Sequence, residues 1–556
     1  MLNYLQLDDK VIEGDIEFSF DLAAGIQSGN PPKVTSVAFD GSMTNTSVQN
    51  LPMRHNLEQA DTVLTYQEGE VHISGSGVLD GVQTDFAYQR SQDGTMSLNL
   101  KTANEQAVVS YLQDRFNLPV DGAMRLKVSV SGQPQHAKFR VGISADAKET
   151  SVSFPALDWA KLPGEAATAN MQLNLEQGQL RHIEAIDISA SSLQAKGRLA
   201  FEPGLSINHG YLEQVVLPGH RIDTIFLERD ENGIMQITAE GEQINLVPLR
   251  RNEGMAKGRD LKFDVTSENL ILGTDISFNG HLEGQTTKDG GGEARLQGSL
   301  IVKGKPLLSE GTVNTLFGAQ GEFLSATGVI GGAEAELSYS PSDSGEMILL
   351  ITSENGGRTL DGLNVTDTIR GGKLRLATTF SADSLSAYRT EIELVDFHVV
   401  EAPRAVRAFS VLSVAGLSSL VEGEGTHFSK GQAIIEADGS FFRLEKVRAV
   451  GEAVGVHLLG TYDRQPRQMD ISGDLIPLKQ LSKLIGYVPF FGELLTGIDK
   501  TGIFSTQFTL KGDADDPDVG VNLFALAPGL LRDILSPDWL GGERRRILGV
   551  DEQAEK

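Results

Sequence analysis

The residues best suited to chemistry by type and spacing are four aspartates near the end of the chain. Asp513, Asp515, Asp516 and Asp518 lie within the run KGDADDPDVGVN. A calcium loop supplies oxygen ligands from alternating positions and closes with a bidentate glutamate at its twelfth position. This run has the alternation and lacks that glutamate. Two interpretations remain, a solvated turn between strands and an ion site, and the missing glutamate favours the turn.

The rest of the chain offers few groups that could form a catalytic centre. The ten histidines are scattered, and neither an HExxH motif nor a Walker-type phosphate loop occurs. The absence of cysteine excludes thiol catalysis, disulfides and Cys-ligated metals. We therefore expect a protein that is not an enzyme, with no metal and no cofactor.

Charge and hydropathy limit the partners of the chain. The formal net charge is −27, which argues against nucleic acid, because phosphates need a basic surface. The longest nearly apolar run covers about residues 409–421 and is too short for a membrane-spanning helix. Residues 1–10 have neither the basic nor the apolar part of a signal peptide. We expect the chain to be the C-terminal part of a longer protein or a shortened gene product.

The dominant pattern is the alternation of apolar and polar residues over short segments separated by turns. Three examples of apolar positions that alternate with polar ones are Met124, Leu126, Val128 and Val130; Ile276, Phe278, Gly280 and Leu282; and Phe504, Thr506, Phe508 and Leu510. A period of two predicts strands with one apolar and one polar face. The 61 glycines fit many turns and bulges. We expect a mainly β fold, in which a long, curled, mostly antiparallel sheet forms an elongated apolar groove.

Helical spacing interrupts the strands at a few places. The segment 104–116 (NEQAVVSYLQDRF) predicts a helix that ends before Pro119. Short helices are also expected near the C-terminus, at 402–420, 478–485, 490–496 and 524–535. The chain then divides into an elongated β region (1–400), a C-terminal region with capping helices (401–535) and a disordered tail (536–556).

The segments after residue 360 resemble the AsmA-like superfamily, in particular the YhdP-type proteins of Gram-negative bacteria. The motifs that carry the resemblance are IRGGKLRL (369–376), PFFGELLTG (489–497) and DPDVGVNLFALAPGLLR (516–532). The similarity covers roughly residues 360–535 closely and the strand-rich part before it more weakly, for example at RIDTIFLERDENGIMQITAEGEQINLVPL (221–249).

The resemblance implies a bridge-like lipid carrier whose β-groove is apolar inside and open along one side. Such proteins are anchored in the inner membrane by an N-terminal helix and reach across the periplasm to the outer membrane. We expect the anchor to lie outside this chain. The implied function is a non-enzymatic conduit for phospholipids in envelope biogenesis. The implied location is the periplasm, in association with the inner membrane, and the implied partners are membrane at one or both ends and envelope proteins.

This hypothesis assigns roles to individual apolar residues. The residues expected to contact lipid on the inner face are Leu126, Val128, Leu173, Ile276, Phe278, Leu300, Leu374, Leu376, Phe504 and Phe508. The residues expected to cap one end or lie near the membrane are Phe409, Leu412, Phe490, Phe491 and Leu494.

Two other functions remain open from the sequence. A structural or adhesive β-solenoid should show a fixed repeat period, and none can be aligned. A β-rich polysaccharide-active enzyme needs paired acids beside aromatic platforms for sugars, and the two tryptophans, Trp159 and Trp539, are far apart in the sequence.

Overall fold

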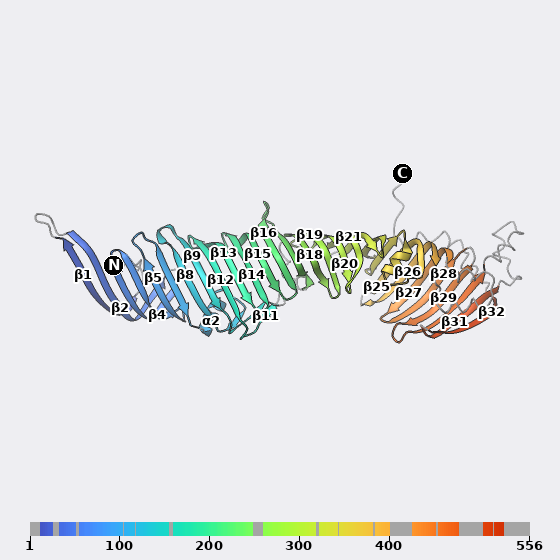
Figure 1. Cartoon of the computed structure of the whole chain (residues 1–556), viewed down its shortest axis with the longest axis horizontal. Helices are drawn as coiled ribbons and strands as arrows, with labels where there is room; N and C mark the ends of the chain where they lie inside the picture. The colour runs from blue at the N-terminus through green and yellow to red at the C-terminus, as the bar shows by residue number, and fades with distance from the viewer. Residues whose placement is uncertain are drawn as a thin grey trace. The chain divides into compact units, whose positions relative to one another are not determined.

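The computed structural model describes residues 12–25, 33–51, 55–247, 260–400, 425–477 and 504–526, apart from 104, 117, 155–158, 319–321, 343, 382–383, 452–453 and 515. The chain divides into two units, Met1–Gly290 (unit 1) and Gly291–Lys556 (unit 2). Each unit is a mostly antiparallel β-sheet, so the expected fold class is confirmed (Figure 1).

The sheet of unit 1 follows the order of the chain, and consecutive strands pair edge to edge. Its strands are β1 (Ile12–Gly25), β2 (Lys33–Leu51), β3 (His55–Gln67), β4 (Glu70–Leu79), β5 (Val82–Arg90), β6 (Met96–Thr102), β8 (Arg125–Gln133), β9 (Lys138–Asp146), β12 (Ala167–Glu176), β13 (Gln179–Ala190), β14 (Leu193–Glu202), β15 (Ser206–Leu217), β16 (His220–Arg229), β17 (Met235–Asn245), β18 (Leu261–Gly273) and β19 (Ile276–Thr286). No described pairing joins β19 back to β1, so this sheet is not closed as a barrel.

Tight turns explain why consecutive strands pair. Gln177 and Gly178 connect β12 to β13 with φ angles of 52° and 77°, and Asp80 and Gly81 connect β4 to β5 with 47° and 85°. Two consecutive positive φ values are typical of the two-residue hairpin turn whose twist matches that of the strands. Such turns keep neighbouring strands antiparallel and in a fixed register.

One pair departs from this pattern. β17 and β18 are parallel, with Met235 opposite Leu261 and Asn245 opposite Ile271. Parallel neighbours begin at the same edge of a sheet, so the connection between them must cross the length of the strands. Most of that connection, residues 248–259, lies outside the described part of the chain.

Two insertions in unit 1 form a small layer over one end of the strands. The first contains helix α2 (Gln106–Phe116) and β7 (Val120–Gly122), and the second contains β10 (Thr150–Phe154) and β11 (Trp159–Lys161). The three strands form a separate sheet in the order β11-β10-β7. α2 lies at the lower edge of the sheet in Figure 1. A short 3-10 helix, η2 (Pro134–His136), joins β8 to β9.

The sheet of unit 2 has the same meander and is also open. Its strands are β20 (Gly292–Val302), β21 (Lys305–Phe317), β22 (Phe323–Ile330), β23 (Ala333–Pro341), β24 (Met347–Ser353), β25 (Ile369–Ser381), β26 (Ser384–Val399), β27 (Thr426–Asp438), β28 (Phe441–Val450), β29 (Val454–Asp463), β30 (Gln468–Pro477), β31 (Phe504–Asp513) and β32 (Asp518–Leu526). Helix α5 (Gly356–Gly362) packs on this sheet, chiefly against β25. Leu360 of α5 is 1% exposed within an apolar core cluster of unit 2.

Several helix predictions can be compared with the structure. The expected helix at 104–116 is confirmed as α2, with its start at Gln106. The expected helices at 402–420, 478–485 and 490–496 lie outside the described residues, as does the tail from 536. The prediction of a helix from Phe524 is wrong at its start, because β32 pairs with β31 up to Leu526. Residues 527–535 of that helix also lie outside the described part.

Candidate functional site

The most extensive chemical feature of unit 1 is an apolar face built from rows of residues that lie opposite one another on successive strands. The residues of the first row, apolar row A, are Gly75, Phe86, Leu100, Val128, Ile143, Met171, Ile186, Gly197, Leu212, Ile225, Ala239, Val265 and Leu282. No member carries a charge or a polar side chain. Each member lies opposite the next from β4 to β19, so the row is continuous although bulges shift the register elsewhere in several of the pairs.

A second row, apolar row B, runs beside the first on the same face. Its residues are Phe18, Gly41, Leu64, Ile73, Tyr88, Leu98, Val130, Val141, Leu173, Ile183, Leu199, Gly210, Leu227, Ile237, Phe263 and Gly284. Tyr88 is the only member with a polar group, and burial raises the pKa of its hydroxyl. The two rows extend the same apolar surface across all the main strands of unit 1.

This surface is only partly covered. Among the described elements, strands pack chiefly against their ladder neighbours, and the layer that covers one end of this face is the small one formed by the insertions. Val128 and Leu173 are accordingly half-buried, although both belong to the apolar rows. At the first strand, Phe18 is 44% exposed. A contiguous apolar surface that water can reach is uncommon in proteins and marks a binding surface.

Helix α2 covers one end of the same face. Val108 and Val109 of α2 are each 1% exposed and form a cluster with Val82, Met124 and Ala145. Leu126, one of the residues expected to contact lipid, packs against this cluster. The insertion therefore covers the part of the face next to row A. Val128 and Val130, which follow Leu126 on the same face, do not belong to the cluster with α2.

The apolar face of unit 2 is filled more completely by its own side chains. The buried cluster on this face consists of Ile351, Leu360, Leu374, Leu376, Leu394, Phe397, Phe428, Val454, Leu475 and Phe508. α5 closes part of it, since a Cβ at Gly356 would lie 2.6 Å from Leu394 and 2.7 Å from Leu374. The close approach of this helix requires glycine at that position.

The residues expected to contact lipid thus fall into distinct environments. Val128 and Leu173 lie in the half-buried rows, and Leu300 is half-buried opposite Leu308. Ile276 is 41% exposed at the start of β19.

The other residues expected to contact lipid are buried, or their side chains are not among those that the structure describes. Phe278 is 0% exposed, and Leu374, Leu376 and Phe508 are at most 6% exposed. For Phe504, only its position in β31 is described. The expected end-cap residues Phe409, Leu412, Phe490, Phe491 and Leu494 lie outside the described residues.

The aspartate run lies at a hairpin. Asp513 ends β31 and Asp518 begins β32, and Asp516 donates its backbone N–H to the carbonyl of Asp513 at 3.1 Å. Within the described residues, no cluster of three or more carboxylate or imidazole groups could hold a metal ion, and Asp515 is not among those residues. The described part of the run is therefore a turn.

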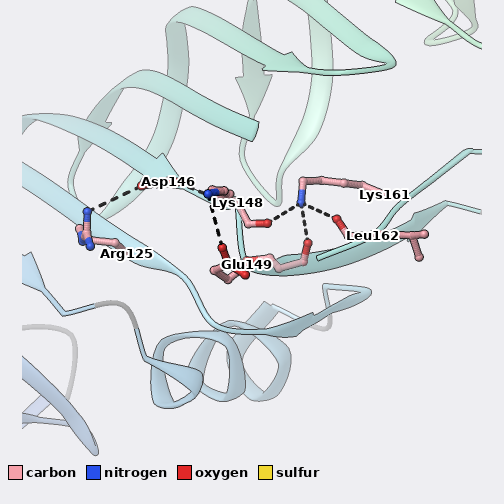
Figure 2. A network of polar contacts seen from close by, with 7 residues as sticks. Arg125, Asp146, Lys148, Glu149, Lys161 and Leu162 are labelled. Carbon is pink, nitrogen blue, oxygen red and sulfur yellow. Dashed lines mark hydrogen bonds and ion pairs between the residues drawn. The ribbon is translucent and has the colours of Figure 1, made fainter. Parts of the chain in front are cut away.

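A buried lysine in the small sheet is a feature that the sequence pattern did not reveal. Figure 2 shows the Lys161 ammonium among three backbone carbonyls. Its Nζ donates to Thr150 at 2.7 Å, Leu162 at 3.0 Å and Lys148 at 3.1 Å. The residue is 2% exposed, and burial lowers the pKa of its amino group. Since all three N–H donors are used, this lysine links β10, β11 and the loop before β10.

A histidine–aspartate pair also proves to be structural. His55 Nδ1 lies 2.5 Å from Asp80 Oδ2, and the Asn56 backbone N–H donates to Asp80 Oδ1 at 2.8 Å. Burial alone would raise the pKa of Asp80, but the bonds from His55 and Asn56 together with nearby positive charge lower it. The pair ties the β4–β5 turn to the start of β3.

Comparisons with known proteins do not extend this description. No family model, curated protein or solved structure matches the chain. In the described residues, no helix is long and apolar enough to cross a membrane. The resemblance to the AsmA-like superfamily therefore stays a prediction.

Proposed function

We propose that the apolar face of unit 1 binds the acyl chains of phospholipids and that the protein is a non-enzymatic lipid conduit. The observation that carries the proposal is the continuity of rows A and B. They present uncharged side chains on every main strand from β5 to β19, half-exposed over much of their length. An ordinary core would bury such residues against a second layer.

The energetics fit a carrier without a single specific site. Each CH₂ group removed from water contributes about 0.8 kcal/mol, whichever strand it contacts. Neighbouring strands lie roughly 4.8 Å apart and offer similar residues, so an acyl chain can move along the rows without a large barrier. Row B would extend over roughly 70 Å at this spacing.

The chemistry of the opposite face supports the same proposal. Polar residues such as Lys127 and Ser129 alternate with the apolar rows and are exposed. In a sheet of this kind, water can hydrate the polar face while the apolar face binds lipid. Under this proposal the head groups lie at the open side of the sheet and the chain acts in the periplasm between two membranes.

The pairing of strands favours a conduit over a solenoid. A solenoid joins strands of successive coils, whereas here consecutive strands pair antiparallel through short turns, as β12 does with β13. Apart from β17–β18, the described pairs are antiparallel, although longer connections join some of them, such as β6 and β8 or β9 and β12. The meander leaves one side of the sheet without an opposing coil.

Lipid binding and transfer can be measured directly. Lipids that co-purify with the full chain are identified by native mass spectrometry of the protein and by thin-layer chromatography of a lipid extract. A second assay follows a fluorescent phospholipid from donor to acceptor vesicles. Co-purifying phospholipid and transfer that rises with protein concentration are expected. If neither bound phospholipid nor uptake of the fluorescent lipid is found, the conduit proposal is wrong.

A further inference from the structure

The polar face of unit 1 carries a cavity that the apolar face does not explain. Its volume is about 580 Å³, and it extends across β5, β6, β8, β9, β12 and β13. These strands are neighbours in the sheet (Figure 1). We call this cavity the polar trough. Its size is within the range of small-molecule sites.

One side of the trough is a row of polar residues in register. In order across the six strands they are Asp85, Lys101, Lys127, Ser144, Asn170 and Asp187. All six are exposed. The row places two cations and two neutral hydrogen-bonding groups between terminal carboxylates.

Small residues in the adjacent row create the hollow. Ala87, Gly142 and Ala185 line the trough and alternate with the longer side chains of Asn99 and Gln172. A Cβ at Gly142 would lie 2.6 Å from the Ser129 hydroxyl oxygen, so even alanine would reduce the space there. The hollow therefore depends on residue sizes at matched positions of separate strands.

The lysine pair gives the trough its chemical preference. Lys101 and Lys127 lie directly opposite each other on β6 and β8. Like charges at such positions repel. Within the described part of the chain, neither ammonium group has a hydrogen-bond or ion-pair partner, whereas Lys138 lies 3.1 Å from Glu176 and Lys262 lies 2.8 Å from Asp230. An anion between the two lysines would remove the repulsion.

We propose that the polar trough binds a phosphate ester of a sugar or other polyol. The phosphate would accept hydrogen bonds from Lys101 and Lys127, and such charge-assisted bonds are stronger than neutral ones. The hydroxyl and amide groups of Ser129 and Asn170 would bind polyol hydroxyls. The carboxylates of Asp85 and Asp187 would accept hydrogen bonds from hydroxyl groups and repel further negative charge. The trough thus favours one phosphate on a neutral polar body.

The polar side chains of the trough lie on the face opposite apolar rows A and B, although five members of row A also line it: Phe86, Leu100, Val128, Ile143 and Met171. Substitutions of the polar side chains can therefore test this assignment separately from lipid transport. The same chemistry occurs in soluble sugar phosphates and in polyol head groups of phospholipids. The experiment therefore needs a soluble probe and a membrane probe.

Binding of glucose 1-phosphate to the full chain can be measured by calorimetry, with glucose and inorganic phosphate as comparison probes. We expect the sugar phosphate to bind tightest. The variant Lys101→Gln/Lys127→Gln should lose at least about tenfold in affinity, since it removes both charge-assisted hydrogen bonds to the phosphate. The control Lys303→Gln/Lys305→Gln removes two exposed lysines from the β20–β21 turn and should keep the affinity of the unchanged protein.

Labelling of lysines gives a readout tied to the site. The sugar phosphate should protect Lys101 and Lys127 from acetylation, read by mass spectrometry, and leave Lys303 reactive. Filling the hollow with Ala185→Met should weaken binding without a change of charge. Equal loss of affinity in the control variant, or binding that leaves both trough lysines reactive, overturns the proposal.

The membrane probe is vesicles with and without phosphatidylinositol in phosphatidylcholine. Binding that requires phosphatidylinositol and both trough lysines supports a head-group ligand, and binding of glucose 1-phosphate alone supports a soluble one. If neither probe binds in a way that depends on the lysines, the trough is not a phosphate site. Failure here leaves lipid transfer by the other face unaffected, and each lysine variant can be checked for normal transfer.

Discussion

Val128 and Ser129 are consecutive residues of β8 whose side chains lie on opposite faces of the sheet. Val128 is half-buried between Leu100 and Ile143 in apolar row A. Ser129 is exposed in the polar trough between Asn99 and Gly142. The same short segment therefore contributes to two surfaces with different chemistry, and substitutions at neighbouring positions can separate their functions.

A charge on the apolar face should impair lipid transfer. In the variant Val128→Asp/Leu173→Asp, bound acyl chains would cover carboxylates that have no hydrogen-bond or ion-pair partner. Burying such charges costs several kcal/mol. We expect transfer of fluorescent phospholipid between vesicles to fall by about tenfold or more. The fold should persist, because both positions are half-buried and not part of a closed core.

The control for this experiment is Ser129→Asp, which adds a carboxylate one residue away on the polar face. It should transfer lipid at the rate of the unchanged protein. Equal loss in both variants, with normal circular dichroism, would contradict the assignment of the apolar face to lipid.

Phe508 should contribute to stability and not to lipid contact. It is 5% exposed and packs closely on Gly473, where a Cβ would lie 2.6 Å from its ring. Replacing a buried phenylalanine by alanine leaves a cavity and costs about 3–5 kcal/mol. Phe508→Ala should therefore lower the free energy of unfolding of unit 2. This free energy is measured by denaturant titration, with far-ultraviolet circular dichroism as the signal.

Phe441, which is 39% exposed, provides the comparison. Phe441→Ala should change the free energy of unfolding by less than about 1 kcal/mol. If Phe508→Ala were equally mild and reduced lipid transfer, Phe508 would belong to the lipid surface after all.

The buried lysine of the small sheet should stabilise the insertions of unit 1. Lys161→Met keeps much of the side-chain volume and leaves three carbonyls without their donor. Loss of hydrogen bonds to a buried charged group should cost about 2–4 kcal/mol. Hydrogen exchange followed by mass spectrometry should show faster exchange over residues 148–162.

The matched substitution is Lys148→Met. The Lys148 side chain is 60% exposed and lies 3.9 Å from Glu149, and exposed pairs of this kind contribute about 0–1 kcal/mol. Exchange over residues 148–162 should remain slow in this variant. Fast exchange in both variants would show that loss of any lysine charge in this region causes the effect, and not loss of the buried hydrogen bonds of Lys161.

Acid should weaken the attachment of the β4–β5 turn to β3. The pKa of Asp80 is lowered in the folded protein, so ionised Asp80 stabilises the fold at pH values above the ordinary aspartate pKa of about 3.9. This contribution is lost as the pH falls through the lower folded value, because the unfolded chain then binds the proton no more readily than the folded one. The difference in thermal midpoint between the unchanged protein and Asp80→Asn should therefore shrink as the pH falls below the ordinary aspartate pKa of about 3.9. A difference that is constant over this range would show that the carboxylate charge is not the cause.

Much of the fold is determined locally and could be read from the sequence. Alternation at Leu126, Val128 and Val130 predicts a strand with one apolar face, and the structure confirms it in β8. Gln177–Gly178 favours a tight hairpin because glycine adopts positive φ without strain. Helical spacing likewise predicted α2, since a period of 3.6 needs only a dozen residues to be recognised.

Only the tertiary structure decided which apolar residues are available to a ligand. Leu126 and Val128 have the same pattern in the sequence, yet α2 packs beside Leu126 and not over row A. Phe278 and Ile276 also alternate in one strand, but they are 0% and 41% exposed. The reason is that coverage depends on insertions and connections that fold back from elsewhere in the chain, and a local period contains no information about them.

The polar trough shows the same limit of sequence patterns. Lys101 and Lys127 are separated by the α2 insertion and become neighbours only because β6 pairs with β8 in one register. The sequence determined that a sheet with one apolar and one polar face would form. The register between strands decided which side chains meet on each face, because a shift of one residue would exchange the two faces.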